Sequence, residues 1–230
     1  MNTRTYSPFD RLIDALDQAL RTVAGPAPTP SRPNPAAAHP EPELSDAERG
    51  LAGKLMRINH AGEISAQALY QGQALTARLP TVQALYQGQA LTARLPTVRA
   101  RMEQASIEEN DHLAWTEERI RELGTHVSVL APFWYAGSFA IGALAGIAGD
   151  KWSLGFVVET ERQVVRHLDD HLAQLPAHDA RDRAILEQMR EDEAHHATTA
   201  LGAGAAALPE PVKRVMALTS KVMTGTAYWI

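Results

Sequence analysis

Two Glu-x-x-His motifs constrain this chain more than any other feature of its sequence. The first is Glu109–His112 (ENDH), and the second is Glu193–His196 (EAHH). On an α-helix three residues advance by about 300°, so the Glu and the His of each motif lie on one face, roughly one turn apart. Each pair can therefore chelate a metal ion. Two such pairs, with one Glu from each of two further helices, form the cage of a di-iron four-helix bundle.

Glu63 is the first of those two further glutamates. Ser45 and Glu48 have the spacing of a capping box and predict the start of a long helix. Met56 and Tyr70 each lie seven residues from Glu63, so Glu63 belongs to the apolar stripe of this helix. A carboxylate in such a stripe is costly unless it is paired or bound to a metal. We therefore interpret Glu63 as a metal ligand.

Glu161 is the second of the two further glutamates. It lies on a helix predicted over residues 153–175. It falls on the apolar line of this helix, whereas Glu159 lies roughly 200° away and is predicted to be a solvated surface charge. We interpret His167 and His171 as residues of the polar face or as neighbours of the ligands, and not as ligands themselves.

The motif residues also occupy apolar stripes, on two further predicted helices. One is predicted to begin near Thr97, and the other after Asp179, which is its predicted N-cap. The helical spacing selects His196 over His195, because His196 is three residues from Glu193. Asp192 precedes Glu193 directly. We hypothesise that Asp192 accepts a hydrogen bond from a ligand imidazole of the facing motif.

The composition limits both the chemistry and the partners. The chain has no cysteine, so a metal must be held by oxygen and nitrogen ligands. Four carboxylates with two imidazoles suit iron or manganese better than structural zinc. The net charge is −5 and there is no basic run, which argues against nucleic acid as the main partner. The N-terminus lacks the apolar run of a secretory signal.

The sequence suggests three regions. Residues 1–23 have apolar residues at helical spacing and predict an amphipathic helix that docks on its own domain, or else binds a membrane surface or a partner. Residues 24–44 form a proline-rich linker, for which we expect no fixed structure. Residues 45–230 form the predicted di-iron domain.

A tandem duplication interrupts this domain. Residues 67–82 recur without change as residues 83–98, which indicates a recent duplication or an error in the sequence. Sixteen residues rotate an ideal helix by about 160° beyond whole turns, and each copy contains a helix-breaking proline. We therefore predict that the first long helix ends near Arg78. The second copy should form a short helix or loop outside the cage.

Residues 127–149 contain no charged side chain and are long enough to span a bilayer. Pro132 and several glycines disfavour a spanning helix, so we predict a buried crossover connection or a hairpin that dips into one leaflet. Its small residues would permit close helix packing. The final segment, 212–230, ends in Tyr228 and Trp229 and is predicted to cap the bundle or to reach a membrane interface.

Four segments carry a resemblance to a known family. They are NHAGE (59–63), ENDH (109–112), TERQV (160–164) and DEAHH (192–196). Together they resemble the di-iron demethoxyubiquinol hydroxylases of ubiquinone biosynthesis. The resemblance covers roughly residues 51–230, leaves the proline-rich N-terminal region outside, and is interrupted by the duplication.

The resemblance implies an all-α, ferritin-like four-helix bundle with an extra hydrophobic crossover and a C-terminal segment. It implies an O2-dependent monooxygenase that hydroxylates the ring of a polyprenylated demethoxy-benzoquinol, with two iron ions as cofactor. Glu63 and Glu161 would be terminal or bridging ligands, and Glu109 and Glu193 would bridge. His112 and His196 would each cap one iron.

Further expectations concern the partners of the protein and its location in the cell. We expect a peripheral protein on the cytoplasmic side of the bacterial inner membrane, with a lipid-presenting or biosynthetic partner protein. The electron donor, the quinol itself or NADH, stays open. The alternative is a ferritin-like iron-storage or peroxide-scavenging protein, which would not need the uncharged segment. A third interpretation is that the duplication makes this chain an inactive variant of a hydroxylase.

Overall fold

The structure, a computed structural model, describes residues 8–76 and 96–230. Within these ranges the regular structure is entirely helical, which confirms the predicted fold class. The elements are α1 (Pro8–Ala24), η1 (Pro35–Ala38), α2 (Asp46–Thr76), α4 (Pro96–Glu122), α5 (Ala131–Ala148), α6 (Asp150–Gln174), α7 (Ala180–Gly202) and α8 (Glu210–Ala227).

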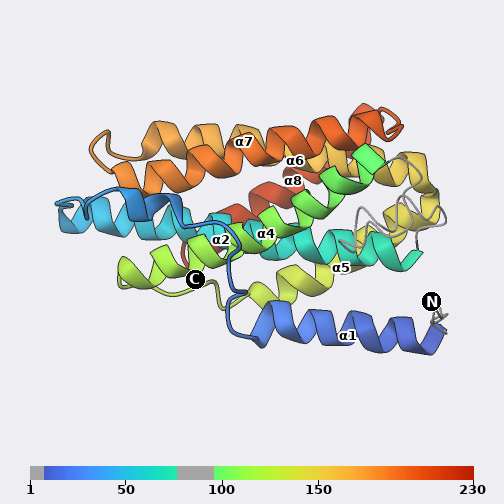
Figure 1. Cartoon of the computed structure of the whole chain (residues 1–230), viewed down its shortest axis with the longest axis horizontal. Coiled ribbons are helices and arrows are strands. Elements are labelled where there is room, and N and C mark those ends of the chain that lie inside the picture. Colours follow the sequence, from blue (N-terminus) through green and yellow to red (C-terminus); the bar gives the residue numbers. More distant parts are fainter. Residues whose placement is uncertain (1–7, 77–95) are drawn as a thin grey trace.

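Helices α2, α4, α6 and α7 form the four-helix bundle, and α1, α5 and α8 are added around it (Figure 1). Two predicted helix starts are confirmed. Ser45 donates its hydroxyl and its backbone N–H to the Glu48 carboxylate, at 2.7 and 2.9 Å, just before α2. Asp179 caps α7 by accepting a hydrogen bond from the backbone N–H of Asp182 at 3.2 Å. These caps satisfy backbone donors that the first helical turn leaves without partners.

A hydrophobic core fills one end of the bundle. It combines buried side chains of all four bundle helices, among them Leu55, Trp115, Leu168 and Leu186. Ala36 of η1 is completely buried in the same core. The expectation of no fixed structure for residues 24–44 is therefore wrong. The prolines of this segment make an extended strap with few backbone donors, and its side chains and one short helical turn anchor it to the bundle.

Helix α5 packs very closely on α2. A side chain added at Gly142 would overlap the backbone of Leu69, and one at Gly72 would overlap the backbone of Phe139. This confirms that small residues in the uncharged segment permit close helix packing. The segment is a crossover from α4 to α6, as predicted.

The crossover is not buried, which corrects that part of the prediction. Only 22% of the residues of α5 are buried, and Phe133 and Leu144 are 72% and 67% exposed. Of the helices in the described residues, α5 is the one with the length and apolar composition that a membrane crossing requires. One face of α5 therefore serves the core and the other is left uncovered.

The remaining helices differ in how they are anchored. Helix α1 packs its residues Ala19 and Val23 on the cluster that contains Ile64, and exposes Leu16 and Leu20. Helix α8 ends with Ala227 buried against α2. Helix α4 begins at Pro96, next to the predicted Thr97. Residues 83–95 of the second repeat copy lie outside the described residues, so their predicted short helix or loop stays a prediction.

Candidate metal centre

The structure brings all six predicted ligands together in the middle of the bundle. Each of the four bundle helices contributes, and each of the six residues is at most 8% exposed. The predicted ligands are Glu63 on α2, Glu109 and His112 on α4, Glu161 on α6, and Glu193 and His196 on α7. His195, which the helical spacing excluded, is exposed.

The six residues form two overlapping groups of four. One group contains Glu63 and His112, the other contains Glu161 and His196, and both contain Glu109 and Glu193. Within each group, one donor atom of every residue lies within 4.8 Å of the others. Two metal positions that share two carboxylates would follow from this arrangement.

Both imidazoles present Nδ1 to the cage. The Nδ1 atom of His112 lies 3.3 Å from Oε1 of Glu193 and 3.7 Å from Oε2 of Glu63. The Nδ1 atom of His196 lies 3.1 Å from Oε2 of Glu193 and 3.4 Å from Oε1 of Glu109. These nitrogens are thus the atoms available for coordination.

The other ring nitrogen of each imidazole, Nε2, contacts a carboxylate that directly precedes the motif on the facing helix. Nε2 of His112 lies 2.9 Å from Oδ2 of Asp192, which is the contact that we hypothesised. Nε2 of His196 lies 3.0 Å from Oε2 of Glu108. Sequence reasoning missed Glu108. The signal was present, because an acidic residue directly precedes the Glu of both motifs.

The electrostatics of the cage fit a cation. Burial raises the pKa of Glu63 and Glu161 well above the usual range, and the neighbouring Glu193 carboxylate adds to this rise. Burial also acts on Glu193, but His196 and His112 outweigh it and lower its pKa.

Several donor atoms in the cage also lack partners. Among the described residues, one carboxylate oxygen of each of Glu63, Glu109 and Glu161, together with Nδ1 of His112, is buried without a hydrogen bond. Such groups are costly unless a ligand satisfies them. A pair of divalent metal ions would satisfy these atoms and neutralise the carboxylates.

Residues beside the cage correct one prediction and extend the site. Glu159 is not a solvated charge; it is 8% exposed and accepts a hydrogen bond from Gln163 at 2.9 Å. The side chain of Tyr70 donates its hydroxyl to Glu161, a contact that the sequence did not suggest.

His171 contacts Asn59 through Nδ1 at 2.9 Å and lies outside the cage, as predicted.

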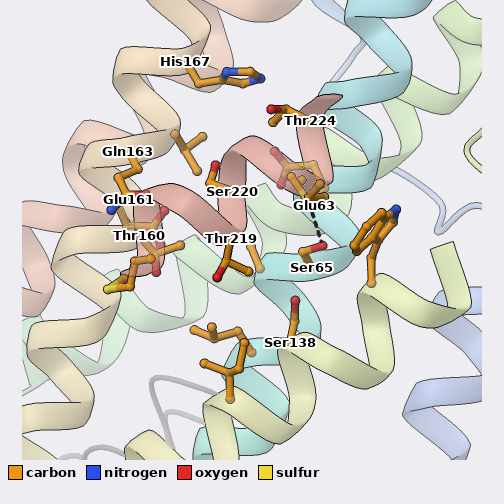
Figure 2. Close-up of a pocket in the computed structure, with 18 of the residues that line it drawn as sticks. Glu63, Ser65, Ser138, Thr160, Glu161, Gln163, His167, Thr219, Ser220 and Thr224 are labelled. Carbon is orange, nitrogen blue, oxygen red and sulfur yellow. Dashed lines mark hydrogen bonds between the residues drawn. The ribbon is translucent and has the colours of Figure 1, made fainter. Parts of the chain in front are cut away.

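A cavity of about 380 Å³ opens beside the cage. Figure 2 shows Glu63 of α2 and Glu161 of α6 in its wall, with Thr219, Ser220 and Thr224 of α8 around it. The rest of the lining is largely apolar and comes from α2, α5, α6 and α8. An elongated apolar molecule could therefore reach the cage from the side of α5 and α8.

Comparison with known proteins identifies relatives over the whole chain. The family model described as ubiquinone biosynthesis protein COQ7 matches residues 51–84 and 80–227, and these two matches meet within the duplication. A 3-demethoxyubiquinol 3-hydroxylase of Nitrosococcus oceani is 56% identical over 230 residues, which cover 100% of both chains. A protein of the same name from Stutzerimonas stutzeri is 57% identical over 227 residues, 99% of this chain and 98% of the relative.

A third relative with this name, from Acinetobacter baylyi, is 53% identical over 227 residues, which cover 99% of this chain and 100% of the relative. These matches also include the proline-rich N-terminal region, which lies outside the resemblance carried by the four sequence segments. The bundle, the paired motifs and the matches over the full length agree, and we conclude that this chain belongs to the COQ7 family of ubiquinone biosynthesis proteins.

Proposed function

We propose that this chain is a di-iron hydroxylase that acts on the ring of a polyprenylated demethoxy-benzoquinol, a late step of ubiquinone biosynthesis. One observation carries the proposal. Two four-residue groups of buried ligands share Glu109 and Glu193, and an apolar cavity adjoins them. The relatives named 3-demethoxyubiquinol 3-hydroxylase support the substrate class.

The proposed ligand roles follow from the two overlapping groups. Glu109 and Glu193 would bridge the two metal positions, because each belongs to both groups. Glu63 and His112 would complete one position, and the remaining pair, Glu161 and His196, the other. Carboxylate-rich ligation with two imidazoles favours iron over structural zinc.

When bound, two ferrous ions would supply the electrons and the open coordination positions that O2 activation needs. Residues of the chain would orient the ligands and shield them from water. Asp192 and Glu108 hold the Nε2 atoms of His112 and His196, so that both rings keep Nδ1 directed into the cage. The six candidate ligands are at most 8% exposed, which would limit the access of bulk water to the metal ions.

The cavity would bind the substrate. Its wall includes Glu63, Glu161 and Glu193, so a ring at this end would lie next to the metal ligands. The prenyl tail would extend along apolar residues such as Leu69, Ile141 and Val215. Transfer of this tail from water to the apolar lining would contribute roughly 0.8 kcal/mol per buried CH2 group.

We further propose that the outer faces of α5 and α8 rest on the cytoplasmic side of the bacterial inner membrane. Phe133 and Leu144 of α5 and Val215 and Leu218 of α8 are 64–72% exposed, although their helices line the cavity. Exposed apolar patches of this kind favour an interface. A lipid-presenting partner protein would deliver the substrate at the same faces.

A vesicle assay tests the membrane assignment. Phe133→Lys combined with Leu144→Lys should reduce co-sedimentation with phospholipid vesicles by at least tenfold, because two charges would have to enter the apolar layer. Leu201→Lys is the matched control, since Leu201 is an apolar residue of α7 that is 46% exposed and belongs to neither helix. If the double variant binds vesicles as well as the parent chain does, the outer face of α5 is not the membrane-binding surface.

The activity assay uses chain loaded anaerobically with ferrous iron. After addition of O2 and a short-tailed demethoxyubiquinol, we expect a product that carries one additional oxygen atom from O2. Parallel reactions with and without NADH would identify the electron donor. Glu193→Gln should remove the product, and formation of product without bound metal would contradict the proposal.

The alternative, an iron-storage or peroxide-scavenging protein, uses the same cage but does not require the apolar cavity beside it. Two measurements separate the functions. A hydroxylase should bind about two irons per chain and retain quinone lipid after mild purification. A storage protein should accumulate many more irons per chain and carry no quinone.

A further inference from the structure

Arg32 lies in the strap between α1 and α2, residues 25–45, outside the part of the chain that the family model matches. Its guanidinium group lies over the ring of Trp115 on α4, 4.8 Å from the ring centroid. The side chain of Arg32 is 26% exposed, so it covers the outer surface of the bundle at this point. Neither the motifs nor the helical spacing pointed to this residue.

The guanidinium group contacts three carboxylates on two helices. Its Nε donates to Oδ2 of Asp111 on α4 at 2.7 Å, and one terminal nitrogen donates to Oδ2 of Asp192 on α7 at 2.9 Å. Its other terminal nitrogen lies 3.7 Å from Oε1 of Glu108. Asp192 and Glu108 are the two carboxylates that contact Nε2 of His112 and His196.

We propose that Arg32 is a positioning residue of the metal centre, which fixes both outer carboxylates and through them both histidine ligands. The proposal rests on the metal centre proposed above. A single side chain of the N-terminal strap would thereby act on both metal positions at once.

Charge and geometry both support this role. Asp192 and Glu108 add two carboxylates to a region that already contains four, and the positive charge of Arg32 lies against both of them. A guanidinium group is planar and offers several donors in fixed directions, so it can hold two carboxylates on different helices in a set geometry. A lysine has one donor centre and cannot span both in the same way.

The strap has other anchors, so its attachment does not depend on Arg32 alone. Ala36 is buried in the core, and Glu41 pairs with Arg119 of α4 at 2.9 Å. The backbone N–H of Ser31 donates to Asp111 at 2.6 Å. A variant of Glu41 can therefore weaken the strap without touching Asp192 or Glu108.

The experiment compares the full-length chain with Arg32→Gln, Arg32→Lys and Glu41→Gln. The affinity for Fe²⁺ is measured anaerobically by competition with a coloured chelator, and the melting temperature of the metal-free protein reports the attachment of the strap. Loss of an outer partner of a histidine ligand typically weakens metal binding by 10–100-fold. We expect a loss of this size in Arg32→Gln, a smaller loss in Arg32→Lys, and unchanged affinity in Glu41→Gln.

Two results would overturn the inference: Arg32→Gln binds Fe²⁺ as tightly as the parent chain, or Glu41→Gln loses as much affinity as Arg32→Gln. The second result would mean that attachment of the strap as a whole matters, and not the contact of Arg32 with the carboxylates. A failure of the proposed function looks different, because the parent chain itself would then bind no iron.

Discussion

Nε2 of His112 on α4 lies 2.9 Å from Oδ2 of Asp192 on α7, so each Glu-x-x-His motif is joined to the other outside the cage as well as within it. The pair of His196 and Glu108, at 3.0 Å, repeats this contact in the opposite direction. An imidazole whose Nε2–H is donated to a carboxylate leaves Nδ1 available to a metal. The two motifs thus position one another's histidines.

Asp192→Ala should lower the affinity for Fe²⁺ by 10–100-fold, because His112 would lose the partner that orients its ring. The measurement is an anaerobic titration against a competing chelator. Asp169→Ala is the control, since Asp169 is an exposed residue of α6 that pairs with Arg190. Equal affinities in the two variants would show that Asp192 has no part in metal binding.

Glu161→Gln should separate metal binding from stability. The iron content should fall below about two per chain, because one ligand of the second group is lost. The metal-free variant should be at least as stable as the parent chain at pH 7, because burial raises the pKa of Glu161 and its ionised form is disfavoured in the folded state.

Urea denaturation of the metal-free proteins and iron analysis together test this prediction. Glu187→Gln, at an exposed carboxylate of α7, should change neither quantity. A clear loss of stability in Glu161→Gln would mean that Glu161 stabilises the fold without metal.

Gly142→Ala should destabilise the protein by on the order of 2 kcal/mol, because the new methyl group would overlap the backbone of Leu69 in α2. Gly137→Ala, in the same helix, meets no atom within 4 Å and should be slightly stabilising, since alanine favours a helix over glycine by about 1 kcal/mol. Thermal and urea unfolding measure both. Equal effects at the two positions would contradict the close packing of α5 on α2.

His60 and His171 should each lower the stability of the metal-free protein as the pH falls from about 6.5 to 4. Burial lowers the pKa of His60 to about 4 and that of His171 to about 3. Below their ordinary pKa near 6.5, the unfolded chain binds protons that the folded chain excludes, so the free energy of unfolding decreases with falling pH. The effect should be on the order of a few kcal/mol.

Urea unfolding at several pH values measures this dependence. His60→Asn should flatten it, whereas substitution of the exposed His178 should not. An identical pH dependence in the parent chain and in His60→Asn would contradict the assignment to His60.

Deletion of residues 83–98 should leave the iron content at about two per chain. All six candidate ligands lie outside the two repeat copies, on helices that meet in the middle of the bundle. Iron analysis after anaerobic loading checks the prediction in the parent chain and in the deletion variant. Two irons in the shortened form alone would identify the duplicated chain as an inactive variant.

The sequence by itself determined the helical class and identified the six candidate ligands that the fold brings together. A Glu and a His three residues apart must share a helix face, and a carboxylate within an apolar stripe must point into the bundle. For this reason the spacing distinguished His196 from His195 and Glu161 from Glu159. The same logic predicted the start of α2 at Ser45, because capping is a local interaction.

Only the tertiary structure decided that the N-terminal strap lies against the metal centre. The contacts of Arg32 with Asp192 and of Glu41 with Arg119 join residues 160 and 78 positions apart, and no local pattern encodes such pairs. Proline content suggested a free linker for residues 24–44, since proline disfavours helices and sheets. It could not show that these residues dock on the bundle, because the partners that hold them lie on α4 and α7 and are assembled only by folding.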